Sequence, residues 1–102
     1  MTTFLYAIGR RCGPVKIGIS ANPKGRLAEF QTACPFKIHL LHFALCESRA
    51  SAFEDEASAH RFLREHRLWG EWFNVDWTVA HDVVSTAVLA GNHFRERLRR
   101  GE

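Results

Sequence analysis

Hydrophobic and polar positions near the start of the chain alternate in a way that predicts a hairpin. Residues 4–9 are aromatic and β-branched enough for a strand, and residues 15–19 alternate apolar with polar or small side chains, as half-buried strands do. Residues 10–14 between them contain glycine, proline and two arginines, which favours a turn with a basic tip. The two strands are therefore expected to pair antiparallel, with Tyr6 and Lys16 on neighbouring strands.

A helix and a third strand are expected next. Asn22 is a good helix cap and Pro23 suits the first helical position, so a helix should run from Pro23 to about Gln31. Residues 37–46 are apolar enough for a central strand of the sheet.

The second half of the chain predicts two more helices separated by a short extended segment. The first helix covers residues 52–66 and is capped by Ser48 or Ser51, the extended segment covers residues 71–75, and the last helix covers residues 76–98. The order β-β-α-β-α-α predicts an α+β fold. In it a small, mainly antiparallel sheet, made of the hairpin and the third strand, is flanked by helices.

Two polar side chains interrupt the apolar side of the helix at 52–66. Glu56 and His60 lie one turn apart within a broad arc that also contains Phe53 and Phe62. A carboxylate there must pair, bind a metal or change protonation, because burying it alone is costly. Two interpretations stay open: a structural Glu56–His60 pair, or a carboxylate at a groove between sheet and helix that holds a divalent cation beside His60.

The composition fits one globular domain spanning residues 1–102. Apolar residues make up 46% of the chain and charged residues 25%, a mixture that excludes disorder, and no apolar run is long enough to span a bilayer. No secretory signal is recognisable, so a cytoplasmic location is expected. Three cysteines without a CxxC pair indicate reduced thiols rather than a disulfide scaffold or a zinc site.

Basic residues gather at the two ends of the chain around a more acidic middle. The net charge is only +3, yet five basic residues precede the first acidic one, Glu29. This distribution suits a polyanion such as nucleic acid, with Arg10, Arg11 and Lys24 as candidate contacts. Ordinary solubility charge explains it equally well.

Several short motifs in a fixed order resemble the GIY-YIG endonuclease superfamily. The resemblance is to the branch of small phage-type and meiotically-upregulated-type domains, in which the second motif reads KIG and a GEWF sequence closes the pattern. The matching residues are Phe4-Leu5-Tyr6, Lys16-Ile17-Gly18, Arg26, Glu56 and Gly70-Glu71-Trp72-Phe73. The resemblance covers residues 4–75 and leaves 76–98 as an extension.

The resemblance implies catalytic roles for Tyr6, Lys16, Arg26, Glu56 and His60. Glu56 is expected to bind Mg²⁺ or Mn²⁺, and Arg26 to donate hydrogen bonds to phosphate oxygens. Tyr6 is expected to position the attacking water, or to deprotonate it if nearby cations lower the pKa of the phenol. Lys16 stands in place of the second tyrosine, which leaves phosphate binding to Lys16 and the role of base to His60 as alternatives.

These observations predict a divalent-metal-dependent endonuclease that hydrolyses DNA phosphodiester bonds, as a monomer or a homodimer. A nucleic-acid-binding module that lost cutting, and a small structural protein with a buried Glu56–His60 pair, remain the alternatives. The aromatic residues near the closing motif are expected to serve mainly in packing, and any exposed one could stack on a base. They are Trp69, Trp72, Phe73 and Trp77.

Overall fold

The first two strands form the expected hairpin. In the computed structural model, which describes residues 2–101, strand β1 (Phe4–Gly9) pairs antiparallel with β2 (Val15–Ser20), and Tyr6 lies opposite Gly18. Gly13 turns the chain between the strands with a φ of 85°, a conformation that glycine adopts without strain. Tyr6 and Lys16 lie on neighbouring strands, as predicted.

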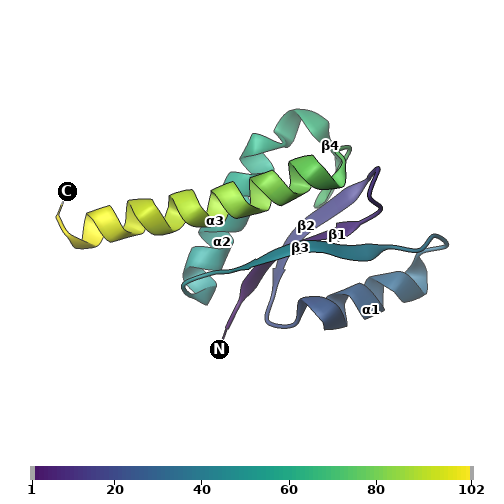
Figure 1. The fold of residues 1–102 in the computed structure, drawn as a ribbon, viewed down its shortest axis with the longest axis horizontal. Coiled ribbons are helices and arrows are strands. Elements are labelled where there is room, and N and C mark those ends of the chain that lie inside the picture. Colours follow the sequence, from purple (N-terminus) through teal and green to yellow (C-terminus); the bar gives the residue numbers. More distant parts are fainter. Residues whose placement is uncertain (1, 102) are drawn as a thin grey trace.

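Residues 2–101 build an α+β fold around a five-stranded antiparallel sheet, which confirms the predicted fold class (Figure 1). The strand order is β3-β1-β2-β5-β4, where β3 is His39–Leu45, β4 is Arg67–Trp69 and β5 is Trp72–Phe73. The sheet therefore gains two short strands from the segment that separates the last two helices.

The expectation that residues 37–46 form a central strand is wrong, because β3 lies at one edge of the sheet. Its apolar side chains pack against a helix instead of lying between two neighbouring strands. Leu41 and Ala44 pack on the core beneath the last helix, whereas Phe43 and Leu45 are exposed, with Phe43 stacked edge-on against Phe4. Helix cover and a central position give the same apolar sequence pattern.

Helix α1 (Pro23–Ala33) covers one face of the sheet. The side chain of Asn22 caps it by accepting a hydrogen bond from the backbone N–H of Gly25. Leu27 and Phe30 of α1 pack against a small buried cluster of Tyr6, Ile8 and Ile38. This helix runs alongside the sheet (Figure 1).

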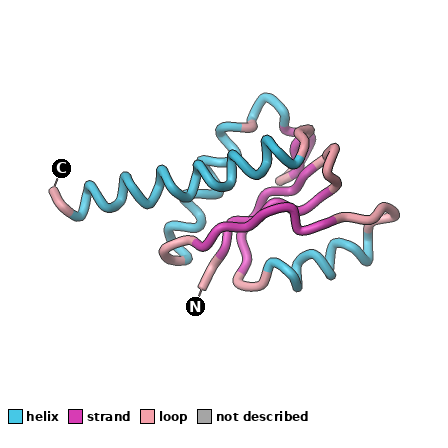
Figure 2. Tube along the Cα trace, viewed as in Figure 1, coloured by secondary structure: helices cyan, strands magenta, loops and turns pink. Residues whose placement is uncertain are grey.

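Helices α2 (Arg49–Phe62) and α3 (Trp77–Arg99) cover the other face, where they enclose the main core with Leu5, Ala7 and Ile17 (Figure 2). Helix α2 begins earlier than predicted because Ser48 and Ser51 cap each other's backbone N–H groups in a capping box. It gives way to a single 3₁₀ turn (Arg64–His66). Helix α3 passes through Gly91 without a break and extends beyond the sheet (Figure 1).

The buried face of α2 differs from the predicted arc. Phe53 and Phe62 are exposed, whereas Asp55, expected outside the arc, is only 1% exposed. The reason is Arg95 of α3, whose guanidinium holds both carboxylate oxygens of Asp55 at 3.1 and 3.2 Å. Glu56, the next residue along α2, therefore lies at the edge of the buried face of the helix and is half-buried.

Two further expectations concern membranes and thiols. Among residues 2–101, no helix combines the length and the hydropathy that a membrane crossing requires. The described cysteines, Cys12, Cys34 and Cys46, carry free thiols.

Candidate active site

A cleft of about 450 Å³ lies where α1 and α2 meet the hairpin. Its charged and phenolic lining comes from five elements: strands β1 and β2, helices α1 and α2, and the turn between β4 and β5. These side chains are Tyr6, Lys16, Arg26, Arg49, Glu56 and Glu71. The sequence thus brings a phenol, a guanidinium and the α2 carboxylate to one cleft, as the motif order predicted.

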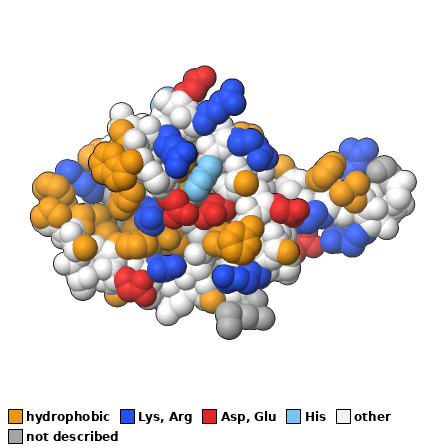
Figure 3. Space-filling view, turned by 180° about the vertical axis from the view of Figure 1, so that it is seen from behind, with side chains coloured by type: hydrophobic (Ala, Val, Ile, Leu, Met, Phe, Trp, Pro, Cys, Tyr) orange, Lys and Arg blue, Asp and Glu red, His pale blue; other side chains and the backbone are white. Residues whose placement is uncertain are grey.

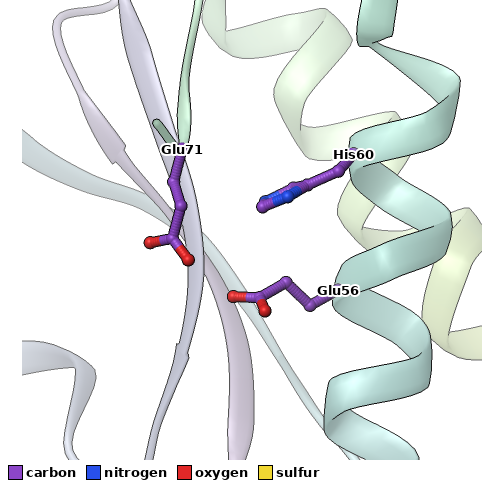
Figure 4. A group of neighbouring side chains, drawn as sticks. All are labelled: Glu56, His60 and Glu71. Carbon is purple, nitrogen blue, oxygen red and sulfur yellow. The ribbon is translucent and has the colours of Figure 1, made fainter. Parts of the chain in front are cut away.

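Three potential metal ligands gather at the inner side of this cleft. Glu56 and His60 project from successive turns of α2, and Glu71 projects toward them from the turn before β5 (Figure 4). One ligand atom of each residue lies within 4.8 Å of the others. Helical spacing fixes the first two on one face, and tertiary packing adds the third.

Backbone contacts of Ile17 hold this cluster together. Nε2 of His60 donates to the carbonyl oxygen of Ile17 at 2.9 Å, and the His60 ring packs on Phe73. The N–H of Ile17 donates to the carbonyl oxygen of Glu71 at 3.0 Å. Because the hydrogen bond occupies Nε2, Nδ1 of His60 keeps its lone pair for a proton or a metal ion.

The two carboxylates are close enough to perturb each other. Burial, the charge of Glu71 and a hydrogen bond that protonated Glu56 donates to Glu71 raise the pKa of Glu56 to about 7, against a smaller opposing effect of Lys16. The ammonium of Lys16 forms an ion pair with Glu71 Oε1 at 3.2 Å. Near neutral pH Glu56 is therefore partly protonated, and a divalent cation can replace that proton.

Tyr6 lies beneath the cleft and is almost fully buried. Its ring fits against Gly18, where an added Cβ would lie 2.6 Å from the phenol oxygen. Burial and the charge of Glu71 raise the pKa of Tyr6 to about 12, and the lowering effect of Arg26 is smaller. The nearby cations therefore do not lower the pKa of Tyr6 as the role of a base would require, and the phenol keeps its proton near neutral pH.

Two cations stand over the cleft on the α1 side. Arg26 is half-exposed, pairs with Glu29 at 3.2 Å and lies 5.9 Å from the centre of the Phe30 ring. Nζ of Lys16 lies 5.0 Å from the same ring. Two positive groups that both line the cleft thus lie near the Phe30 ring, an arrangement suited to the oxygens of a phosphate.

Comparison with known families decides the membership of the chain. Residues 3–88 match the model of the T5orf172 domain. The chain belongs to the T5orf172 domain family. T5orf172 domains occur in nuclease-like and DNA-binding proteins, which associates this one with nucleic acids. No curated protein and no solved structure matches it.

This match corrects the family expected from the motifs. The GIY-YIG assignment is wrong, because the matching model is that of the T5orf172 domain and no GIY-YIG model matches. Short strings such as KIG and GEWF are individually weak signals. The site of this T5orf172 domain therefore depends on the geometry of its own side chains.

The three basic residues expected to contact nucleic acid lie outside the cleft of the T5orf172 domain. Arg10 lines a separate apolar hollow, Arg11 lies beside Trp77, and Lys24 lies near Phe4. The cleft instead receives Arg49, which sequence reasoning missed. It follows the helix cap Ser48, and only the packing of α2 against the hairpin shows where it points.

The aromatic residues divide into packed and exposed ones. Phe73 is fully buried and Trp72 is half-buried, as the packing interpretation expects. Trp69 is 70% exposed and Trp77 is 44% exposed, so the packing interpretation is wrong for both. Trp69 lies at the edge strand β4, and Trp77 lies in the first turn of α3, where no second layer covers them.

Proposed function

We propose that this T5orf172 domain is a divalent-metal-dependent endonuclease that hydrolyses phosphodiester bonds of DNA in the cleft. The observation that carries the proposal is that Glu56, His60 and Glu71 form one cluster beside the cations Arg26 and Lys16. A phosphodiesterase needs a metal-binding group and donors for phosphate charge in the same place. The family's association with nuclease-like proteins supports the same activity.

The donor set fits Mg²⁺ or Mn²⁺. Carboxylate oxygens suit both ions and imidazole suits Mn²⁺, and the remaining positions would be filled by water and phosphate. The proton that Glu71 helps to keep on Glu56 shows how unfavourable two adjacent carboxylates are without a cation. When bound, the cation polarises the phosphate and stabilises the leaving oxygen.

The remaining residues of the cleft bind and orient the phosphate. Arg26 offers a planar fork of N–H donors, and Lys16 offers a compact charge beside the cluster. Arg49 extends the positive lining toward the start of α2. Tyr6, kept neutral by burial, can donate a hydrogen bond to a phosphate oxygen or to the attacking water.

His60 connects the cluster to the sheet. Its hydrogen bond to Ile17 orients the ring, so that the second nitrogen is free either to bind the cation or to accept the proton of water. Glu56 and Glu71 lie close to the same ring, so they can support either role of His60, metal binding or proton acceptance.

Incubation of pure protein with supercoiled plasmid and Mn²⁺ or Mg²⁺ tests the proposal. The wild type should cut and Glu56→Gln should not. Glu54→Gln is the matched control, because Glu54 is an exposed carboxylate on the same helix that points away to Arg95. Salt-sensitive binding without cutting by the wild type would favour a module that only binds nucleic acid.

A further inference from the structure

A second hollow of about 220 Å³ lies on the same side of the sheet as the cleft. Its walls are almost entirely apolar and include Phe36, Ile38, Trp69 and Trp72, with Arg10 as its cation. We refer to these five residues as the aromatic pocket. Among the residues that the structure describes, no carboxylate lines it.

The fold leaves this pocket open. Helix α1 covers the sheet face over β3, β1 and β2, and the short strands β5 and β4 continue the sheet beyond it (Figure 1). Trp69 and Phe36 are 70% and 55% exposed there. Single exposed apolar side chains are ordinary, but two large aromatic rings lining one hollow indicate a binding surface.

The aromatic pocket lies next to the cleft, with Lys16 of the cleft beside Trp72 of the pocket. Lys16 and Trp72 are opposite each other on β2 and β5, and Lys16 Nζ lies 5.8 Å from the centre of a Trp72 ring. The same ammonium pairs with Glu71 at 3.2 Å. Glu71 and Trp72 are consecutive, so one lines the cleft and the next lines the pocket.

The charges of the pocket match a nucleotide. The guanidinium of Arg10 lies 4.9 Å above the Phe36 ring, where the ring holds it at the rim. Figure 3 shows hydrophobic side chains to the left of and below the central acidic and histidine side chains, with lysine or arginine between and around them. Flat apolar walls beside cations suit a base with its phosphates, since every base offers a π-face for stacking.

We propose that the aromatic pocket binds an unpaired nucleobase of a DNA strand whose phosphates continue into the cleft. The inference rests on the proposed function and narrows its substrate class to DNA with a single-stranded segment beside the bond that is cut. Bases inside a duplex are stacked on both faces and cannot enter such a pocket without leaving the helix.

Binding measured without divalent metal tests this separately from cutting. Two labelled DNA probes are compared by fluorescence anisotropy in EDTA: a blunt duplex and the same duplex with a single-stranded extension. The wild type should prefer the extended duplex. Trp69→Ala and Phe36→Ala should each reduce that preference by about 5- to 150-fold, and Trp69→Phe should largely keep it. Trp77→Ala, which removes an exposed tryptophan outside the pocket, is the control.

The outcomes separate the two proposals. Equal binding of both probes by the wild type, or an unchanged preference in Trp69→Ala, overturns the proposal that the pocket binds a base. The proposed nuclease activity is then still decided by the plasmid assay. A change of oligomeric state in Trp69→Ala with an unchanged preference assigns the pocket to a second copy of the chain and likewise overturns it. A preference that depends on Trp69, without any plasmid cutting, supports base binding in the pocket and overturns the proposed nuclease activity.

Discussion

The carboxyl groups of Glu56 and Glu71 lie in one cluster although they come from a helix and a distant turn, and their proximity helps to raise the pKa of Glu56 to about 7. The fold therefore accepts an unfavourable electrostatic interaction at the cleft. Residues selected for function commonly lower stability in this way.

Replacing Glu56 should stabilise the metal-free protein at high pH. The folded pKa lies above the ordinary value of 4.5, so the folded state holds more protons between these values and loses stability as the pH rises from about 4.5 to 7. Glu56→Gln should raise the free energy of unfolding at pH 8 by on the order of 1 kcal/mol after solvent screening, and with it the melting temperature, and should change both little at pH 4. Thermal melting followed by circular dichroism at both pH values, in EDTA, measures this change in stability. An equal effect at the two pH values would contradict the raised pKa.

Arg26→Ala should abolish cutting while the melting temperature changes little. The guanidinium is half-exposed, and its pair with Glu29 is a surface contact worth less than about 1 kcal/mol. Lys24→Ala, on the same helix but outside the cleft, should cut normally. Plasmid cutting and thermal melting of both variants check this. A large loss of stability in Arg26→Ala would make Arg26 a structural residue instead.

Gly18→Ala should destabilise the protein by about 1–3 kcal/mol, because the new methyl group meets the buried ring of Tyr6. The same substitution should cost less in a Tyr6→Ala background, where the ring is absent. Urea unfolding of the two single variants and the double variant measures the coupling. Additive effects would show that Gly18 and Tyr6 do not constrain each other.

Arg95→Met should destabilise the protein by about 3 kcal/mol, because it leaves the buried carboxylate of Asp55 without its partner. Burial already raises the pKa of Asp55, so the cost should be larger at pH 8 than at pH 5, where the carboxylate can take up a proton. Arg99→Met removes more exposed ion pairs and should cost less than about 1 kcal/mol. Urea unfolding measures the loss of stability in Arg95→Met and in Arg99→Met. Similar losses in the two variants would contradict the role of burial.

Local signals in the sequence predicted the hairpin, the caps at Asn22 and Ser48 and the fold class, because each depends on a few neighbouring residues. The edge position of β3 was not predictable, since an apolar strand looks the same whether a strand or a helix covers it. The burial of Asp55 also depends on a distant partner, Arg95.

The candidate site was likewise predictable only in part from the sequence. Helical spacing put Glu56 and His60 on one face, and the motif order led to Tyr6 and Arg26. The third member of the cluster, Glu71, had no assigned role, because its approach depends on the pairing of β5 with β2. The raised pKa of Tyr6 follows from burial that no local pattern reveals.

The central claim is that Glu56, His60 and Glu71 form a divalent metal site, and calorimetric titration with Mn²⁺ tests it most directly. The wild type should bind the ion stoichiometrically and release protons near neutral pH, because binding displaces the proton of Glu56. Glu56→Gln should lose this binding, and Glu54→Gln should keep it. Absent binding by the wild type, or equal binding by Glu56→Gln, would contradict the claim.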